Sequence, residues 1–159
     1  MTLFTEKKFN IGKLQGISAK TIEEHLKLYS GYVSHTNLCL NKLDELARDL
    51  TKNGYERGEV QRRFGFEYDG MRNHEVYFDS LSDGAKDISK DSELYKSIAY
   101  LWGSFDAWLA RFKSMAMTRG IGWTMLYFDK KEMRLLNAYV EDHELGQLVG
   151  RTPILALDM

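Results

Sequence analysis

The sequence has little of several features that would assign a protein to a special class. It contains one cysteine, Cys39, so an internal disulfide is excluded. Its first residues, 1–6, hold no long apolar run of the signal or membrane type. The net charge is −1, so the chain lacks the excess of positive charge that is typical of nucleic-acid-binding proteins. These absences predict a cytoplasmic protein with neither a nucleic-acid nor a membrane partner.

The composition is that of a soluble folded protein. Hydrophobic residues make up 43% of the 159 residues and charged residues 28%. A chain of this length forms one domain, or two half-domains that share a core, and buries roughly two-thirds of its unfolded surface. We found no internal repeat and no low-complexity segment.

Apolar residues at steps of three and four predict a long helix over residues 18–46, where Thr21 and Glu24 have the spacing of a capping box. The polar residues 51–54 interrupt this pattern, and a second helix is predicted over residues 58–81. The two helices form an antiparallel hairpin, which we assign to an N-terminal domain of residues 1–82.

Residues 82–91 are rich in Ser, Asp and Gly and predict a linker. The second domain, residues 92–159, begins with a helix at 93–102 and a second helix with its apolar stripe at 105–112. Three strands are then predicted, over residues 123–128, 133–140 and 153–158. This order is α+β: a helical hairpin, then helices with a three-stranded antiparallel sheet, without the alternation of a nucleotide-binding fold.

One face of the first helix carries His25, Tyr29 and Tyr32, which lie within about 40° of one another at helical spacing. A histidine in such a place is more often a hydrogen-bonded core residue than a metal ligand, and tyrosines at this spacing are usually core residues. Both interpretations remain open at this point.

His74 on the second helix would face His25 across an antiparallel pair, and Asp158 at the end of the third strand would add an oxygen. Two imidazoles and one carboxylate suit redox-active iron or manganese better than a thiolate-rich zinc site does. The three residues are far apart in the sequence, so spacing alone does not establish a site.

Four ordered segments over about residues 16–159 resemble the iron/manganese superoxide dismutase family. The segments are His25-Leu26-Lys27-Leu28-Tyr29-Ser30-Gly31-Tyr32-Val33; Gly70-x-x-Asn73-His74; Gly103-Ser104-Phe105 through Gly120-Ile121-Gly122-Trp123; and Asp142-His143 followed by Thr152 to Met159. The last of these is similar to the outer-sphere segment and to the start of the family's Asp-x-Trp-x-x-His motif.

The resemblance implies one iron or manganese ion per subunit, held by His25, His74, Asp158 and a second C-terminal histidine, with bound solvent as the fifth ligand. It implies that superoxide is disproportionated in two half-steps to dioxygen and hydrogen peroxide. It also implies a homodimer.

The resemblance further implies roles for residues around the ligands. His143 stands where members carry glutamine or histidine and would hydrogen-bond the bound solvent, and Gly70 would leave room for it. Tyr32 matches the gateway tyrosine, which passes protons inward and restricts access to small anions. The other residues of this group are Tyr29, at the place of a second histidine; Asn73, on the second helix; and Trp123, a wall that excludes water.

The spacing from His25 to Tyr32 is seven residues, whereas many members have eight, so an ungapped alignment places Glu24 under the ligand. We favour His25, because the loss of one helical bulge residue keeps both groups on a common face.

The sequence stops at Met159, before the Trp and His of the terminal motif, so we expect a C-terminal domain that is truncated before the last ligand and the final helices. Two classes of function follow: a superoxide dismutase, or a non-catalytic protein of the same fold that acts as a structural or interaction subunit. The joint presence of His25, His74, His143 and Asp158 favours the enzyme.

Overall fold

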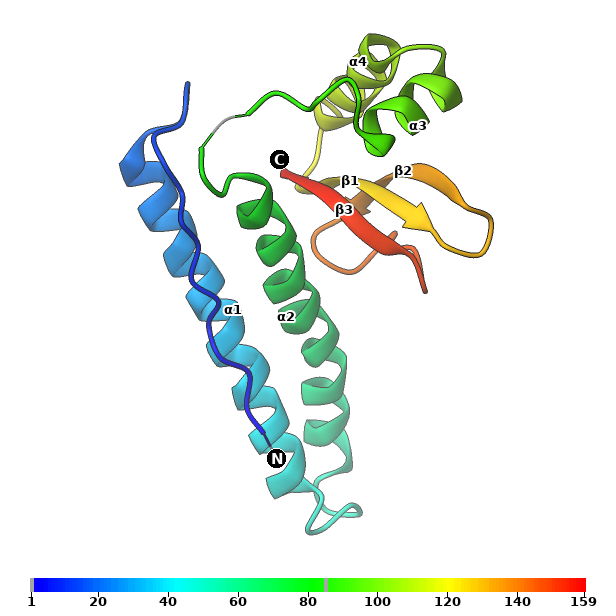
Figure 1. The fold of residues 1–159 in the computed structure, drawn as a ribbon. Coiled ribbons are helices and arrows are strands. Elements are labelled where there is room, and N and C mark those ends of the chain that lie inside the picture. Colours follow the sequence, from blue (N-terminus) through cyan, green and yellow to red (C-terminus); the bar gives the residue numbers. More distant parts are fainter. Residues whose placement is uncertain (1, 85) are drawn as a thin grey trace.

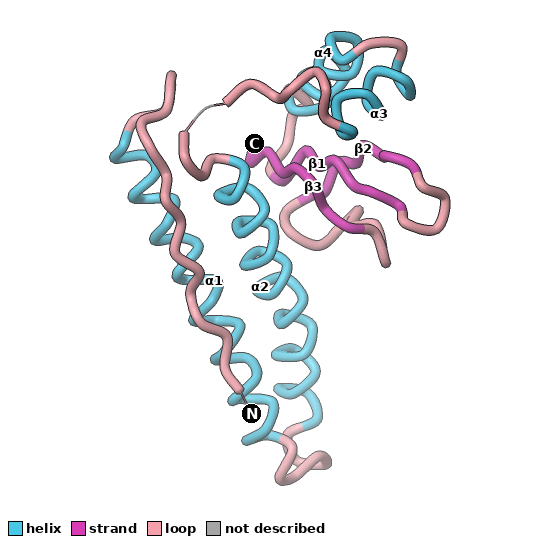
Figure 2. Tube along the Cα trace, viewed as in Figure 1, coloured by secondary structure: helices cyan, strands magenta, loops and turns pink. Residues whose placement is uncertain are grey.

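The computed structural model describes residues 2–84 and 86–159, so Met1 and residue 85 of the predicted linker lie outside the described residues. The N-terminal half is an antiparallel pair of long helices, α1 (Ala19–Leu46) and α2 (Gly54–Ser80) (Figure 1). Residues 2–17 run back along this pair in an extended path (Figure 2). The predicted helical hairpin is confirmed.

The predicted start of α1 is confirmed to within one residue, whereas its predicted capping box and the predicted start of α2 are wrong. The N-cap of α1 is Ser18, whose hydroxyl oxygen accepts a hydrogen bond from the backbone N–H of Thr21 at 3.1 Å. Glu24 forms no capping box with Thr21 and instead accepts a bond from the Lys27 ammonium group at 2.9 Å. The second helix begins at Gly54 rather than residue 58, because the carbonyl of Asn53 already accepts the N–H of Arg57 at 2.9 Å.

The C-terminal half contains two short helices and a sheet. The helices are α3 (Glu93–Trp102) and α4 (Phe105–Ala116), each capped by a serine hydroxyl, with Gly103 in the left-handed conformation between them. The strands are β1 (Gly122–Asp129), β2 (Arg134–Glu141) and β3 (Thr152–Asp158), in the order β2-β1-β3 with both pairings antiparallel. The predicted α+β fold with a three-stranded antiparallel sheet is confirmed.

The central strand β1 is buried on both faces and joins two hydrophobic cores. Trp123, Met125 and Tyr127 pack into the core that the α1–α2 pair covers, whereas Leu126 and Phe128 belong to the core under α3 and α4. This alternation follows from the period of two in a strand. The first core therefore combines residues from both predicted domains, while the boundaries at residues 82 and 92 stay a prediction.

The two ends of β3 have different surroundings. Its last residues lie beside α2 at the centre of the molecule, where the N–H of Met159 donates to the carbonyl of Gly122 at 3.0 Å (Figure 1). Asp158 pairs in register with Trp123 of β1. The end of β3 is thus fixed against the α1–α2 pair. In the described part of the chain, no helix is both long and apolar enough to cross a membrane.

Candidate metal centre

Three elements bring His25, His74 and Asp158 together. The imidazole of His25 on α1 faces that of His74 on α2, with ring centroids 4.9 Å apart. Asp158 reaches the same place from the end of β3. One nitrogen of each ring and one carboxylate oxygen all lie within 4.8 Å of one another. The structure therefore gathers the three residues that the sequence singled out.

His25 and Asp158 approach closely without a satisfactory hydrogen bond. Nε2 of His25 lies 2.8 Å from Oδ2 of Asp158. Among the described residues, however, this buried nitrogen has no hydrogen-bond partner of acceptable geometry. An orphaned nitrogen beside a carboxylate oxygen is the arrangement that a cation satisfies, because the cation accepts electron pairs from both atoms.

His74 is held as a neutral imidazole with one nitrogen available. Its Nδ1 donates to the carbonyl of Gly70, one turn earlier in α2, at 2.6 Å, which leaves the lone pair of Nε2 free for a ligand. Burial lowers the pKa of His74 to about 4, and the neighbouring His25 adds to this effect. A neutral ring near pH 7 is the form that binds a metal.

The structure shows which of Glu24 and His25 faces the candidate centre. The side chain of Glu24 is 58% exposed and pairs with Lys27. That of His25 is 14% exposed and packs against Tyr77 and Phe78. His25, and not Glu24, therefore faces the candidate centre, as we predicted from the common helix face.

His143 and Tyr32 lie beside this group with a defined direction of hydrogen bonding. The Trp123 indole N–H can only donate, and it donates to Nδ1 of His143 at 2.9 Å. The single proton of the neutral ring is then on Nε2, which donates to the Tyr32 hydroxyl oxygen at 2.7 Å. Burial lowers the pKa of His143 and raises that of Tyr32, so both stay neutral near pH 7.

This direction of bonding bears on the predicted bond from His143 to bound solvent. Both ring nitrogens of His143 are engaged, so a solvent bond would have to share the Nε2 proton with Tyr32. Because the hydroxyl oxygen of Tyr32 accepts this hydrogen bond, the hydroxyl hydrogen of Tyr32 is available to another acceptor. The predicted solvent bond stays a prediction, and Tyr32 is the better placed donor.

Gly70 lies directly under these two rings. A Cβ atom at this position would lie 2.7 Å from Cδ1 of Tyr32 and 3.1 Å from Cδ2 of His143. Only a glycine leaves this space free, so the geometry agrees with the predicted role of Gly70 in making room for His143.

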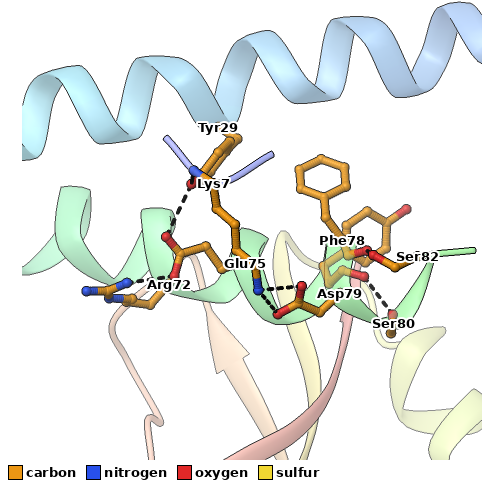
Figure 3. Close-up of polar contacts among 9 residues, drawn as sticks. Lys7, Tyr29, Arg72, Glu75, Phe78, Asp79, Ser80 and Ser82 are labelled. Carbon is orange, nitrogen blue, oxygen red and sulfur yellow. Dashed lines mark hydrogen bonds and ion pairs between the residues drawn. The ribbon is translucent and has the colours of Figure 1, made fainter. Parts of the chain in front are cut away.

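Tyr29 is engaged elsewhere. Its hydroxyl accepts the backbone N–H of Lys7 at 2.8 Å and donates to Glu75 at 3.2 Å (Figure 3). Glu75 in turn pairs with Arg72, and Lys7 pairs with Asp79. Tyr29 thus ties the N-terminal segment to α2. Its position on the face of His25 does not bring its hydroxyl to the ligand atoms.

The structure adds one residue, Gln147, that the sequence did not indicate. Asn73, predicted to lie near the ligands, bonds the carbonyl of His143, and so does Gln147. The side chain of Gln147 also accepts a hydrogen bond from the hydroxyl of Tyr127 on β1. Gln147 lies in an irregular loop where no periodic pattern marks it. Its position four residues after His143 is the only sequence signal that could have found it.

A small cavity of about 200 Å³ adjoins the centre. Its lining includes Tyr32, His74, His143 and Asp158, with the apolar side chains of Leu28 and Ile121 at its edge. This volume accommodates a small anion and a few water molecules. It does not accommodate a large organic substrate.

Comparison with known proteins agrees with this geometry. Residues 90–159 match the family described as iron/manganese superoxide dismutases, C-terminal domain. A protein of Cupriavidus metallidurans named superoxide dismutase [Fe] is 39% identical over 154 residues, which are 92% of this chain and 74% of that protein. The chain belongs to the iron/manganese superoxide dismutase family.

Other relatives carry either metal in their names. A superoxide dismutase [Fe] of Sulfolobus acidocaldarius is 30% identical over 89% of this chain and 69% of its own length. A superoxide dismutase [Mn] of Mycobacterium celatum is 32% identical over 85% of this chain and 96% of its own length. The relatives of this chain therefore include proteins named for iron and proteins named for manganese.

Proposed function

We propose that this chain is a superoxide dismutase that converts two superoxide ions and two protons to dioxygen and hydrogen peroxide. The observation that carries the proposal is the convergence of one atom each from His25, His74 and Asp158 within 4.8 Å. Relatives named superoxide dismutase over most of the chain support it. The small, partly apolar cavity suits a diatomic anion.

The residues present fit an iron or manganese ion, one per subunit. The nitrogens of His25 and His74 and a carboxylate oxygen of Asp158 would hold it, and the resemblance implies a further histidine. When bound, the ion supplies the one-electron oxidation and reduction that the reaction requires. The protein has to bind the anion, exclude other molecules and supply protons.

Proton supply falls to Tyr32 and His143. The hydroxyl of Tyr32 lines the cavity with its hydrogen free of His143, because His143 donates to its oxygen. Its raised pKa keeps the proton in place until a stronger base forms nearby. Trp123 is fully buried and forms part of the inner wall of the cavity.

We expect the purified protein to bind iron or manganese near one equivalent and to remove superoxide. Metal content is measured by elemental analysis and activity by the decay of superoxide after rapid mixing. The same measurements on a version extended through a Trp-x-x-His segment show how much a fourth ligand adds. Neither version holding metal would exclude the enzyme and favour a non-catalytic subunit of this fold.

We also propose that the protein acts in the cytoplasm as a homodimer. The single cysteine, which is buried, suits a reducing compartment, and the resemblance to the family supports the dimer. Cell fractionation and light scattering of the metal-loaded protein test these two points.

A further inference from the structure

Gln147 connects three parts of the chain around His143. Its side-chain amide donates to the carbonyl of His143 at 2.9 Å and to Oδ1 of Asn73 at 3.0 Å. Its side-chain oxygen accepts from the hydroxyl of Tyr127. The residue therefore links the loop that bears His143 to α2 and to β1.

The hydrogen-bond directions in this network follow from one fixed donor. The Tyr127 hydroxyl accepts the backbone N–H of Leu148, and burial raises its pKa to about 12, so it stays protonated and donates to Gln147. The Gln147 oxygen must then accept and its NH₂ must donate. Asn73 consequently turns its own NH₂ toward the His143 carbonyl, at 3.4 Å.

The ring of His143 has a separate fixed donor. The indole N–H of Trp123 donates a hydrogen bond to Nδ1 of His143, and the Nε2–H of His143 donates to the hydroxyl oxygen of Tyr32. The backbone of His143 is held by Gln147 and Asn73, and its ring by Trp123. With both held, the distance from Nε2 to the Tyr32 hydroxyl is determined by the fold.

We propose that Gln147 is a positioning residue that holds His143 against Tyr32 and so sets the rate of proton delivery. This rests on the proposed superoxide dismutase activity. Without Gln147 the carbonyl of His143 keeps only the long bond from Asn73, and the loop is free to shift relative to α2. A shift of the order of 1 Å costs a proton-transfer step about ten-fold or more in rate.

The test compares Gln147→Met, which keeps the length of the side chain and removes its hydrogen bonds, with the original protein. In the metal-free protein, nitrogen NMR of His143 should show the proton on Nε2, and in Gln147→Met this proton should exchange with water about five-fold faster or more. In the metal-loaded protein, kcat should fall about ten-fold with metal content unchanged.

Two further variants make the result decisive. Tyr127→Phe removes the donor to Gln147, together with the acceptor of the Leu148 N–H, and should change both measurements in the same direction but less. Gln61→Met, on the exposed part of α2, should change neither. An unaltered Nε2 proton in both Gln147→Met and Tyr127→Phe would overturn the proposal. If the original protein removes no superoxide, the proposed function fails, while the NMR result still decides whether Gln147 positions His143.

Discussion

His74→Ala should abolish both metal binding and superoxide removal. His74 is 2% exposed, its Nδ1 is fixed by the carbonyl of Gly70, and its other nitrogen faces His25 and Asp158. Alanine removes one of the three ligands in this chain, and the remaining nitrogen and oxygen hold a divalent ion weakly. We expect metal content below about a tenth of an equivalent and a loss of activity of about 100-fold or more.

His35→Ala is the matched control for this prediction. His35 also lies on a long helix, but its side chain is 61% exposed and its Nδ1 lies 3.7 Å from a carboxylate oxygen of Glu67. We expect full metal content and unchanged superoxide removal in this variant. Elemental analysis and superoxide decay are measured on both variants after circular dichroism has shown that each is folded. Metal retained by folded His74→Ala would contradict the assignment of this residue as a ligand.

Gly122→Ala should destabilise the protein strongly. Gly122 has φ +144°, and a Cβ atom there would lie 2.0 Å from the carbonyl oxygen of Val140. Val140 belongs to the neighbouring strand β2, so the contact can be relieved only by a shift of backbone against backbone. We expect the free energy of unfolding to fall by about 3 kcal/mol or more, measured by urea denaturation.

The same change should also weaken the metal centre, because the carbonyl of Gly122 anchors Met159 beside Asp158. Gly58→Ala provides the control. Gly58 lies on the exposed face of α2, and a Cβ atom there would meet no heavy atom of the described residues within 4 Å. Alanine at this helical position should stabilise the protein by about 0.5 to 1 kcal/mol. Equal stability of the two variants would contradict the steric argument at Gly122.

The sequence predicted the type and order of every helix and strand, from apolar spacing in the helices and from aromatic and aliphatic segments bounded by turn residues in the strands. The capping box of α1 and the start of α2 were predicted wrongly. At α1, Ser18 and Thr21 are both plausible caps, and only the structure shows which oxygen accepts a backbone bond. At α2, the polar residues 51–54 were assigned to the break and the helix was predicted from Gly58, whereas Gly54 is already helical.

The candidate site was predicted in part. His25, His74 and Asp158 were grouped from ligand chemistry and family resemblance, and their convergence depends on the tertiary packing of α1, α2 and β3. The direction of Tyr29 depends on its partners Lys7 and Glu75, which helical spacing does not reveal. Gln147 was missed for a similar reason, because its bonds cross from a loop to two distant elements.

The central claim is that His25, His74 and Asp158 hold one redox-active ion. Anomalous X-ray scattering from crystals of the protein loaded with iron, collected at the iron absorption edge, tests it most directly. We predict one peak per chain, bonded to a nitrogen of each histidine and to a carboxylate oxygen of Asp158. A peak bonded to other residues, or no peak in protein exposed to excess iron, would contradict the account.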